Sequence, residues 1–179
     1  MALRKMLFKV VIVGDGGVGK STMVQRLTKG QFIPQKITIG TDLATYNIEL
    51  NPETVVMLQI WDFAGEKRFR FFLPNYARGA VGCLLCYDLT RYQSYENLDE
   101  WLDIVVHNTV DPVIILIGCK QDLAEKQRIV QYEDGLKYQK EHNLYDFIET
   151  SSKSGYNNQV LFEALAYALY EKRDLEHES

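Results

Sequence analysis

A glycine-rich segment near the N-terminus most constrains what this chain can fold into. It reads GDGGVGKST, from Gly14 to Thr22. The apolar run at residues 7–13 before it predicts a buried strand, and residues 23–30 after it have helical spacing and end at a glycine. Glycines let several backbone N–H groups converge on a polyphosphate, and the new helix points its positive end at the same place. The spacing therefore predicts a phosphate-binding loop rather than a glycine-rich turn without a ligand.

Several side chains in and after this loop have the chemistry that a Mg²⁺–polyphosphate site needs. Lys20 can reach the terminal phosphates as a point charge, and Ser21 offers a hydroxyl to Mg²⁺. Thr38 is a candidate for a second hydroxyl, although a threonine in a loop commonly has no such role. Asp62 follows a strand pattern and can hold the Mg²⁺ shell, and Gly65 lets a backbone N–H approach the γ-phosphate. The alternative for Asp62 is an ordinary acid in a turn.

The apolar pattern of the rest of the chain predicts a mostly parallel sheet. Residues 81–87 and 113–118 are unbroken apolar runs, as expected for strands buried on both faces. The segment between them predicts a core-packing helix from apolar residues at i, i+3, i+4 and i+7, namely Leu98, Trp101, Leu102 and Val105. Further helices are expected at residues 130–142 and around Phe162, Leu165 and Leu169, with a short strand at 146–149. This alternation of strands and helices indicates a sheet covered on both faces.

A hairpin is expected at one edge of that sheet. Residues 43–50 and 54–61 are both strand-like, and the turn Asn51-Pro52-Glu53 joins them. So short a connection makes the pair antiparallel. The basic and aromatic segment 67–79 follows, and two interpretations stay open for it. Its aromatic side chains belong to the core, or they form a mobile surface that partner proteins recognise.

Composition limits the broad class of the protein. With 179 residues and 46% hydrophobic content, residues 1–179 predict a single domain, with flexible ends at 1–6 and 174–179. The net charge of −4 argues against a general nucleic-acid binder. The three cysteines lie in or beside apolar runs, so reduced thiols are expected, and the Cys83–Cys86 spacing lacks the second pair that a zinc site needs.

The sequence offers little sign of a membrane anchor. No apolar run approaches membrane-spanning length, residues 1–6 are too short for a signal peptide, and Ala2 stands where N-myristoylation requires glycine. The last three residues contain no cysteine for prenylation. We therefore expect either that the natural chain continues or that no C-terminal lipid anchors it.

Five motifs in order resemble those of the small GTPases of the Ras superfamily, and most closely those of its Rab branch. They are GDGGVGKS (14–21), TIG (38–40), WDFAGE (61–66), CKQD (119–122) and TSSK (150–153). The resemblance implies an α/β P-loop NTPase of the small G-domain type. This fold has a six-stranded, mostly parallel sheet with one antiparallel edge strand and helices on both faces. It also implies a monomeric GTP-binding switch in trafficking-type or signalling regulation, cytoplasmic or peripheral to membranes, that hydrolyses GTP to GDP slowly with Mg²⁺ and an activating protein.

The resemblance further implies a role for each matching residue. Phe32 and the Lys120 stem would pack on the base, Asp122 would accept from guanine N–H groups, and the Ser152 N–H would meet guanine O6. The full set of implied nucleotide contacts is Asp15, Gly16, Gly17, Val18, Gly19, Lys20, Ser21, Thr22, Phe32, Thr38, Gly65, Cys119, Lys120, Asp122, Leu123, Ser151, Ser152 and Lys153. The implied metal ligands are Ser21, Thr38 and, through water, Asp62, and the implied catalytic residues are Glu66, Lys20 and Gly65.

Partner proteins are expected on two loops that respond to the γ-phosphate. An exchange factor, an activating protein and effectors would bind the segment from Ile33 to Gly40 and the segment from Gly65 to Arg78. Effectors of Rab-like proteins read three aromatic residues on this surface. Their positions here are Leu43, Trp61 and Tyr76, with leucine in place of the usual phenylalanine.

Two residues depart from the family pattern. Cys119 replaces an asparagine whose amide braces the base-binding segment, so weaker binding and faster nucleotide exchange are expected. Glu66 replaces the glutamine that orients the attacking water; a carboxylate can accept from water but cannot donate to phosphate. These departures keep open a second hypothesis, a nucleotide-bound scaffold that hydrolyses GTP weakly or not at all. A third, an ATP-dependent P-loop kinase or ATPase, is disfavoured by Asp122.

Overall fold

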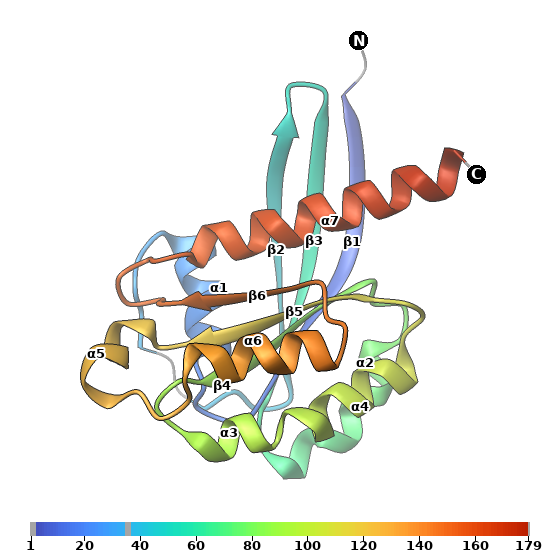
Figure 1. Ribbon diagram of the computed structural model, residues 1–179. Coiled ribbons are helices and arrows are strands. Elements are labelled where there is room, and N and C mark those ends of the chain that lie inside the picture. The colour runs from blue at the N-terminus through green and yellow to red at the C-terminus, as the bar shows by residue number, and fades with distance from the viewer. Residues whose placement is uncertain (1–2, 35–36, 179) are drawn as a thin grey trace.

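The computed structural model describes residues 3–34 and 37–178, which form a six-stranded sheet in the order β2-β3-β1-β4-β5-β6 (Figure 1). Strand β2 pairs antiparallel with β3 at one edge, and all other neighbouring strands are parallel. The predicted sheet and its edge hairpin are therefore confirmed. The strand bounds are β1 Arg4–Val13, β2 Thr41–Asn51, β3 Thr54–Phe63, β4 Gly82–Asp88, β5 Val113–Cys119 and β6 Asp146–Thr150.

Helices cover both faces of the sheet, as expected. Helices α1 and α7 pack on one face, while α2, α4 and α6 pack on the other. The helix bounds are α1 Lys20–Lys29, α2 Leu73–Ala77, α3 Tyr92–Glu96, α4 Leu98–Asn108, α5 Ala124–Gln127, α6 Tyr132–Glu141 and α7 Asn158–Glu178, with 3₁₀ turns η1 Lys67–Phe72 and η2 Gln121–Leu123. The predicted inward faces of α4 and α7 are buried, including Trp101 and Phe162.

Strand β1 passes from a half-covered to a fully covered part of the sheet. In its first half Met6 and Phe8 are buried and Leu7 is exposed, the alternation expected when one face is open to solvent. Residues 10–13 are buried on both faces. Figure 1 shows why: α7 crosses β1, β2 and β3 on one face, and helices α2, α4 and α6 gather over the opposite face lower in the sheet.

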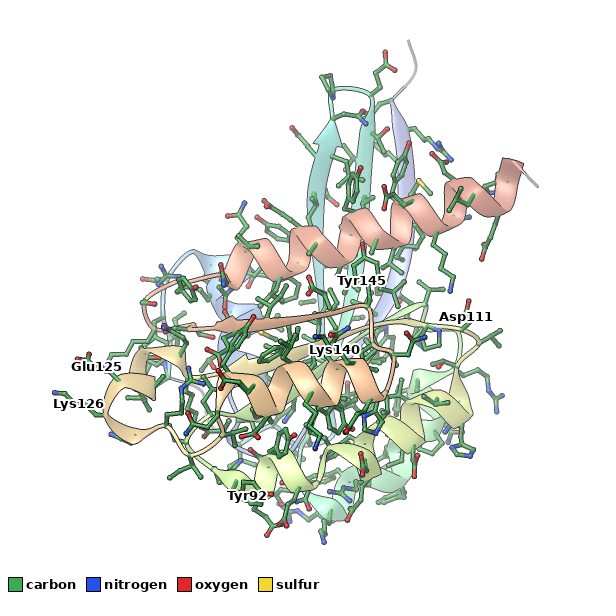
Figure 2. The ribbon with its side chains drawn as sticks, in the orientation of Figure 1. Tyr92, Asp111, Glu125, Lys126, Lys140 and Tyr145 are labelled. Carbon is green, nitrogen blue, oxygen red and sulfur yellow. The ribbon has the colours of Figure 1, made fainter. Side chains whose placement is uncertain are left out.

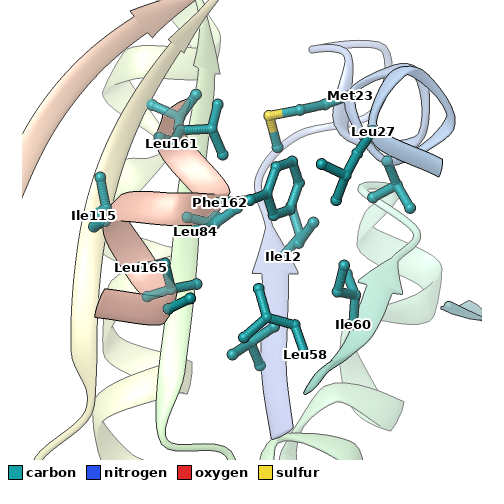
Figure 3. Close-up of a cluster of buried hydrophobic side chains, with 14 of the residues drawn as sticks. Ile12, Met23, Leu27, Leu58, Ile60, Leu84, Ile115, Leu161, Phe162 and Leu165 are labelled. Carbon is teal, nitrogen blue, oxygen red and sulfur yellow. The ribbon is translucent and has the colours of Figure 1, made fainter. Parts of the chain in front are cut away.

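The core between α1, α7 and the sheet fixes the start of the glycine-rich loop. Phe162 of α7 points between Ile12 of β1 and Met23 of α1, and all three side chains are fully buried (Figure 3). Removing a buried phenylalanine side chain costs about 3–5 kcal/mol of stability. The strand before the loop and the helix after it are therefore held by one apolar cluster.

Regular secondary structure extends into both segments that the sequence predicted to be flexible. Strand β1 begins at Arg4 rather than at residue 7, and α7 continues to Glu178. Arg4 forms an ion pair with Asp174 of α7 at 2.8 Å, which joins the two ends. Helix α6 starts at Tyr132, two residues later than predicted, because Gln131 and Asp134 form a capping box there.

Candidate functional site

A pocket of about 760 Å³ opens at the carboxyl ends of the parallel strands, where open α/β sheets bind ligands. It contains most of the residues that the sequence predicted for the nucleotide: Gly16, Gly17, Val18, Gly19, Lys20, Ser21, Thr22, Phe32, Thr38, Gly65, Cys119, Lys120, Asp122, Leu123, Ser152 and Lys153. Glu66 also lines it, together with Pro34 and Ile37, which sequence reasoning had not assigned to the site. Asp15 and Ser151 do not line it and have other partners.

Lys20 lies folded into the glycine-rich loop. Its ammonium donates to the carbonyl oxygens of Gly14 and Asp15, both at 2.8 Å. The side chain is almost fully buried, and burial lowers the pKa of Lys20, while the nearby Asp62 carboxylate acts in the opposite direction. A buried ammonium beside converging backbone N–H groups is suited to binding an anion.

Three oxygen-bearing side chains from separate segments meet beside Lys20. The Ser21 hydroxyl donates to Asp62 Oδ2 at 2.5 Å and lies 2.7 Å from the Thr38 hydroxyl. Burial raises the pKa of Asp62 to about 6, and its Oδ1 is buried with no hydrogen-bond partner among the described residues. Two hydroxyls and a carboxylate with an unpaired oxygen fit a hard divalent cation such as Mg²⁺, which is usually held by few carboxylates.

The metal donors predicted from the sequence are thus brought together, although only one of them is charged. Within the described ranges, no group of three or more His, Cys, Asp and Glu side chains is placed to hold a metal ion. A cation at this site would therefore need further oxygen ligands from water or from a phosphate ligand, as Mg²⁺ usually does.

Gly65 is packed directly against the glycine-rich loop. A Cβ atom at this position would lie 2.1 Å from the Gly16 nitrogen, so no larger residue fits without a backbone shift. The neighbouring Glu66 lines the pocket, and its carboxylate accepts from Arg68 Nε at 2.6 Å. Gly65 and Glu66, two of the three residues predicted to be catalytic, therefore stand at the loop, with the Glu66 charge paired to an exposed arginine.

At the other end of the pocket, a buried side chain holds the Asp122 carboxylate by a hydrogen bond. The fully buried Ser151 donates its hydroxyl to Asp122 Oδ1 at 2.7 Å. The sequence grouped Ser151 with the nucleotide contacts; in the structure its side chain does not line the pocket, and its hydroxyl contacts Asp122. Lys120 has left-handed backbone geometry (φ 68°), and its ammonium pairs with Asp88 at 2.7 Å.

Cys119 lies at the end of β5, among other buried thiols. Cys83, Cys86 and Cys119 are all buried and free. Burial, together with a hydrogen bond with the Cys119 thiol, raises the pKa of the Cys86 thiol. A buried thiol of raised pKa is a poor nucleophile, so Cys86 behaves as part of the core.

One side-chain network had escaped sequence reasoning altogether. The Asp15 carboxylate turns away from the pocket and accepts from Trp101 Nε1 at 2.8 Å and Asn97 Nδ2 at 2.7 Å. Arg70 approaches the same carboxylate at 3.6 Å, stacks over the Trp101 ring and pairs with Glu100. The helical spacing of Trp101 correctly indicated a core residue, but nothing in the sequence signalled its polar N–H contact.

Segment 67–79 buries aliphatic side chains and leaves its aromatic rings exposed or half-buried, so the interpretation as core aromatics is wrong, and recognition by partners stays a prediction. Leu73 and Ala77 are buried in the core, whereas Phe71 and Phe72 are exposed and contact each other with ring centroids 3.9 Å apart. The Tyr76 ring lies 5.5 Å from the Trp61 ring, centroid to centroid, at an angle of 39°, and Leu43 is exposed nearby on β2. Of the first predicted partner segment, Ile33 to Gly40, residues 35 and 36 lie outside the described part of the chain.

Comparison with known proteins gives a consistent relationship. The sequence model of the Ras family matches residues 9–171. The chain is 43% identical to Ras-related protein RABA1c of Arabidopsis thaliana over 87% of this chain and 72% of that protein. It is 41% identical to Ras-related protein RIC2 of rice (95% and 79%) and 39% identical to Ras-related protein rab-11.1 of Caenorhabditis elegans (96% and 81%). None of the described helices is both long enough and apolar enough to span a bilayer.

Proposed function

The chain belongs to the Ras family of small GTPases, near its Rab branch, and from this premise we propose that it is a Mg²⁺-dependent switch that hydrolyses GTP to GDP. The observation that carries the proposal is the meeting of Ser21, Thr38 and Asp62 beside the buried Lys20. These residues come from three segments far apart in the sequence. A hard-cation site next to an anion-binding loop is the arrangement that a metal–polyphosphate requires.

Each part of the pocket has a separate task in this proposal. Backbone N–H groups of the glycine-rich loop and the Lys20 ammonium would bind the phosphates, and Ser21, Thr38 and, through water, Asp62 would hold Mg²⁺. When bound, Mg²⁺ would neutralise part of the phosphate charge. Gly65, packed on the loop, offers its N–H to the γ-phosphate without a side chain in the way.

In this proposal, the Asp122 carboxylate at the other end of the pocket selects the base. Asp122 is an acceptor, oriented by Ser151, and guanine presents the N1–H and N2–H₂ donors that adenine lacks. Phe32 and the stem of Lys120 line the same pocket and can cover the two sides of a flat base. A guanine nucleotide therefore suits the polar groups of this pocket better than an adenine nucleotide.

Intrinsic hydrolysis is expected to be slow. Glu66 can accept a hydrogen bond from the attacking water, but it cannot donate one to the γ-phosphate, and its charge opposes that of the phosphate. Its ion pair with Arg68 further engages the carboxylate. The same pair favours a second candidate function, a guanine-nucleotide-bound scaffold that does not turn over without an activating protein.

The proposed switch acts through the two segments that contact the γ-phosphate. Loss of the γ-phosphate would remove the contacts of Thr38 and Gly65 and relax the loops around them. The exposed Phe71, Phe72 and Leu43 then form the apolar part of a surface that effectors and regulators read. We propose a monomer that works in the cytoplasm or at the periphery of membranes and does not bind nucleic acid.

Two measurements test this function. The nucleotide that copurifies is identified chromatographically, and its release is followed with Mg²⁺ and with a chelator. We expect GDP or GTP, released faster without Mg²⁺. Phosphate release from GTP is then measured in single turnover for the wild-type chain and for Glu66→Gln. Slow release above background supports the GTPase, background-level release in both proteins supports the scaffold, and ATP displacing the bound nucleotide contradicts both.

A further inference from the structure

The turn that follows β4, residues 88–91, touches both ends of the nucleotide pocket. We propose that this turn ties the base-binding segment to the glycine-rich loop and does the bracing that Cys119 cannot do. The inference deepens the proposed guanine-nucleotide function and rests on it. It assigns Asp88 and Arg91 as positioning residues that control how long the nucleotide stays bound.

On the base side, the turn holds Lys120. Asp88 is buried, and its Oδ2 accepts from the Lys120 ammonium at 2.7 Å. The backbone N–H of Leu89 also donates to the Cys119 carbonyl at 3.1 Å. Because the Lys120 ammonium is fixed at its far end, its aliphatic stem is held along the pocket where the base would lie.

On the phosphate side, the turn holds the glycine-rich loop. Arg91 Nη2 donates to the Gly16 carbonyl at 2.6 Å. Its other terminal nitrogen would lie 3.8 Å from a Cβ atom built on Gly17, so the guanidinium lies along the outside of the loop. This contact restrains the loop and adds a positive charge near the site proposed for the phosphates.

The turn itself is rigid enough to transmit this restraint. Asp88 Oδ1 accepts from the Thr90 N–H at 2.8 Å and from the Thr90 hydroxyl at 2.7 Å. The Arg91 N–H donates to the Asp88 carbonyl at 3.0 Å, and the Asp88 N–H donates to the Ser94 hydroxyl at 2.9 Å. The residues that contact the two ends of the pocket are therefore linked to each other within one small hydrogen-bonded unit.

The Cys119 side chain does not itself link the base-binding segment to the glycine-rich loop by strong hydrogen bonds. A thiol is a weak donor and a weak acceptor, and the Cys119 thiol is buried in the same apolar cluster as Cys86. A Cβ atom on Gly19 would lie 3.8 Å from Cys119 Cβ, so the contact between β5 and the loop is apolar packing there. The polar links between the base segment and the loop then run through residues 88–91.

Release of a fluorescent GDP analogue, chased with excess unlabelled GDP in the presence of Mg²⁺, tests the proposal on the full chain. Asp88→Asn should release it about tenfold faster, because the amide oxygen can still accept from Thr90 but the pair with Lys120 is lost. Arg91→Gln should release it about threefold faster. The control Asp111→Asn removes the acid of another lysine pair, at the end of the molecule far from α5 (Figure 2). It should behave as the wild type.

Two further readouts separate positioning from a loss of fold. The melting temperature of Arg91→Gln at saturating GDP and Mg²⁺ should stay within about 2 °C of wild type, because Arg91 is exposed and its loss leaves no buried group unpaired. In a Lys120→Met background, Asp88→Asn should add less than about twofold to the release rate, since Asp88 acts through Lys120.

The outcomes discriminate between this inference and the function on which it rests. If the wild-type chain retains the analogue but Asp88→Asn and Arg91→Gln release it at the wild-type rate, residues 88–91 do not control nucleotide release and the inference is wrong. An effect of Asp88→Asn that persists undiminished without Lys120 also overturns the assignment. A wild-type chain that does not bind the analogue contradicts the proposed function itself. Arg91 is exposed, so its variant remains informative if Asp88→Asn folds poorly.

Discussion

Replacing Asp15 tests the network that joins the glycine-rich loop to α4 and η1. In Asp15→Ala, the fully buried Trp101 N–H loses its acceptor, which costs about 1–3 kcal/mol. Asn97 is only half-buried and can turn to water, and Arg70 keeps Glu100, so each adds less. The expected loss is about 2–3 kcal/mol, or a melting temperature lower by about 4–12 °C in a chain of this length.

Asp15→Asn is the matched control for this prediction. Its amide oxygen can accept from Trp101, and Asn97 can rotate to accept from its amide nitrogen, so the loss should be about 1 kcal/mol or less. Thermal unfolding is followed by circular dichroism at saturating GDP and Mg²⁺, which holds the ligand contribution fixed. Hydrogen exchange of residues 67–77 should rise in the alanine variant because Arg70 is released. Equal melting temperatures for the alanine and wild-type chains, or equal losses in both variants, would refute the reasoning.

Three further substitutions give distinct results. Ser151→Ala removes the donor to Asp122 and should speed GDP release by about tenfold or more. The change should be smaller for a ligand that lacks the base. A GDP release rate equal to that of the wild type would show that Asp122 does not need the Ser151 hydrogen bond. Gly65→Ala places a Cβ atom 2.1 Å from the Gly16 nitrogen and should weaken GTP binding more than GDP binding, as competition titrations would show. Cys119→Asn should slow GDP release by about tenfold, and an unchanged rate would count against the expected role of that amide.

The fold was predictable because its signals are local and repeated. Unbroken apolar runs identified β4 and β5, and helical spacing identified the buried face of α4. The boundaries were less predictable. Lys5 and Leu7 are exposed in β1, so its first residues lack the unbroken apolar pattern, and their strand character depends on pairing with β3 and on α7 lying over them. Tertiary contacts set these ends, and a single sequence does not display them.

In the candidate site, too, features fixed by local sequence were predictable and features that depend on distant contacts were not. The loop glycines, Lys20 and Ser21 were predictable because the backbone requirements of a phosphate site fix residue types at fixed spacing. The partners of Asp15 were not, since Asn97 and Trp101 are more than eighty positions away and each looks like an ordinary helix residue. The hydrogen bond from Ser151 to Asp122 was not predictable either, because a motif gives position but not the direction in which a hydroxyl points.

The charges around the pocket explain how an acidic chain can accept a polyphosphate. Asp15 lies in the loop and Asp88 close to it, yet each carboxylate already has partners, Asp15 in indole and amide donors and Asp88 in the Lys120 ammonium. Asp62 is buried with a raised pKa, so a cation beside it would compensate its charge. Glu66 differs, because its partner Arg68 is largely exposed and screened by solvent. Among these four acids, Glu66 therefore has the least compensated negative charge beside the loop. The phosphate that binds nearest to Glu66 is the one that this charge repels most.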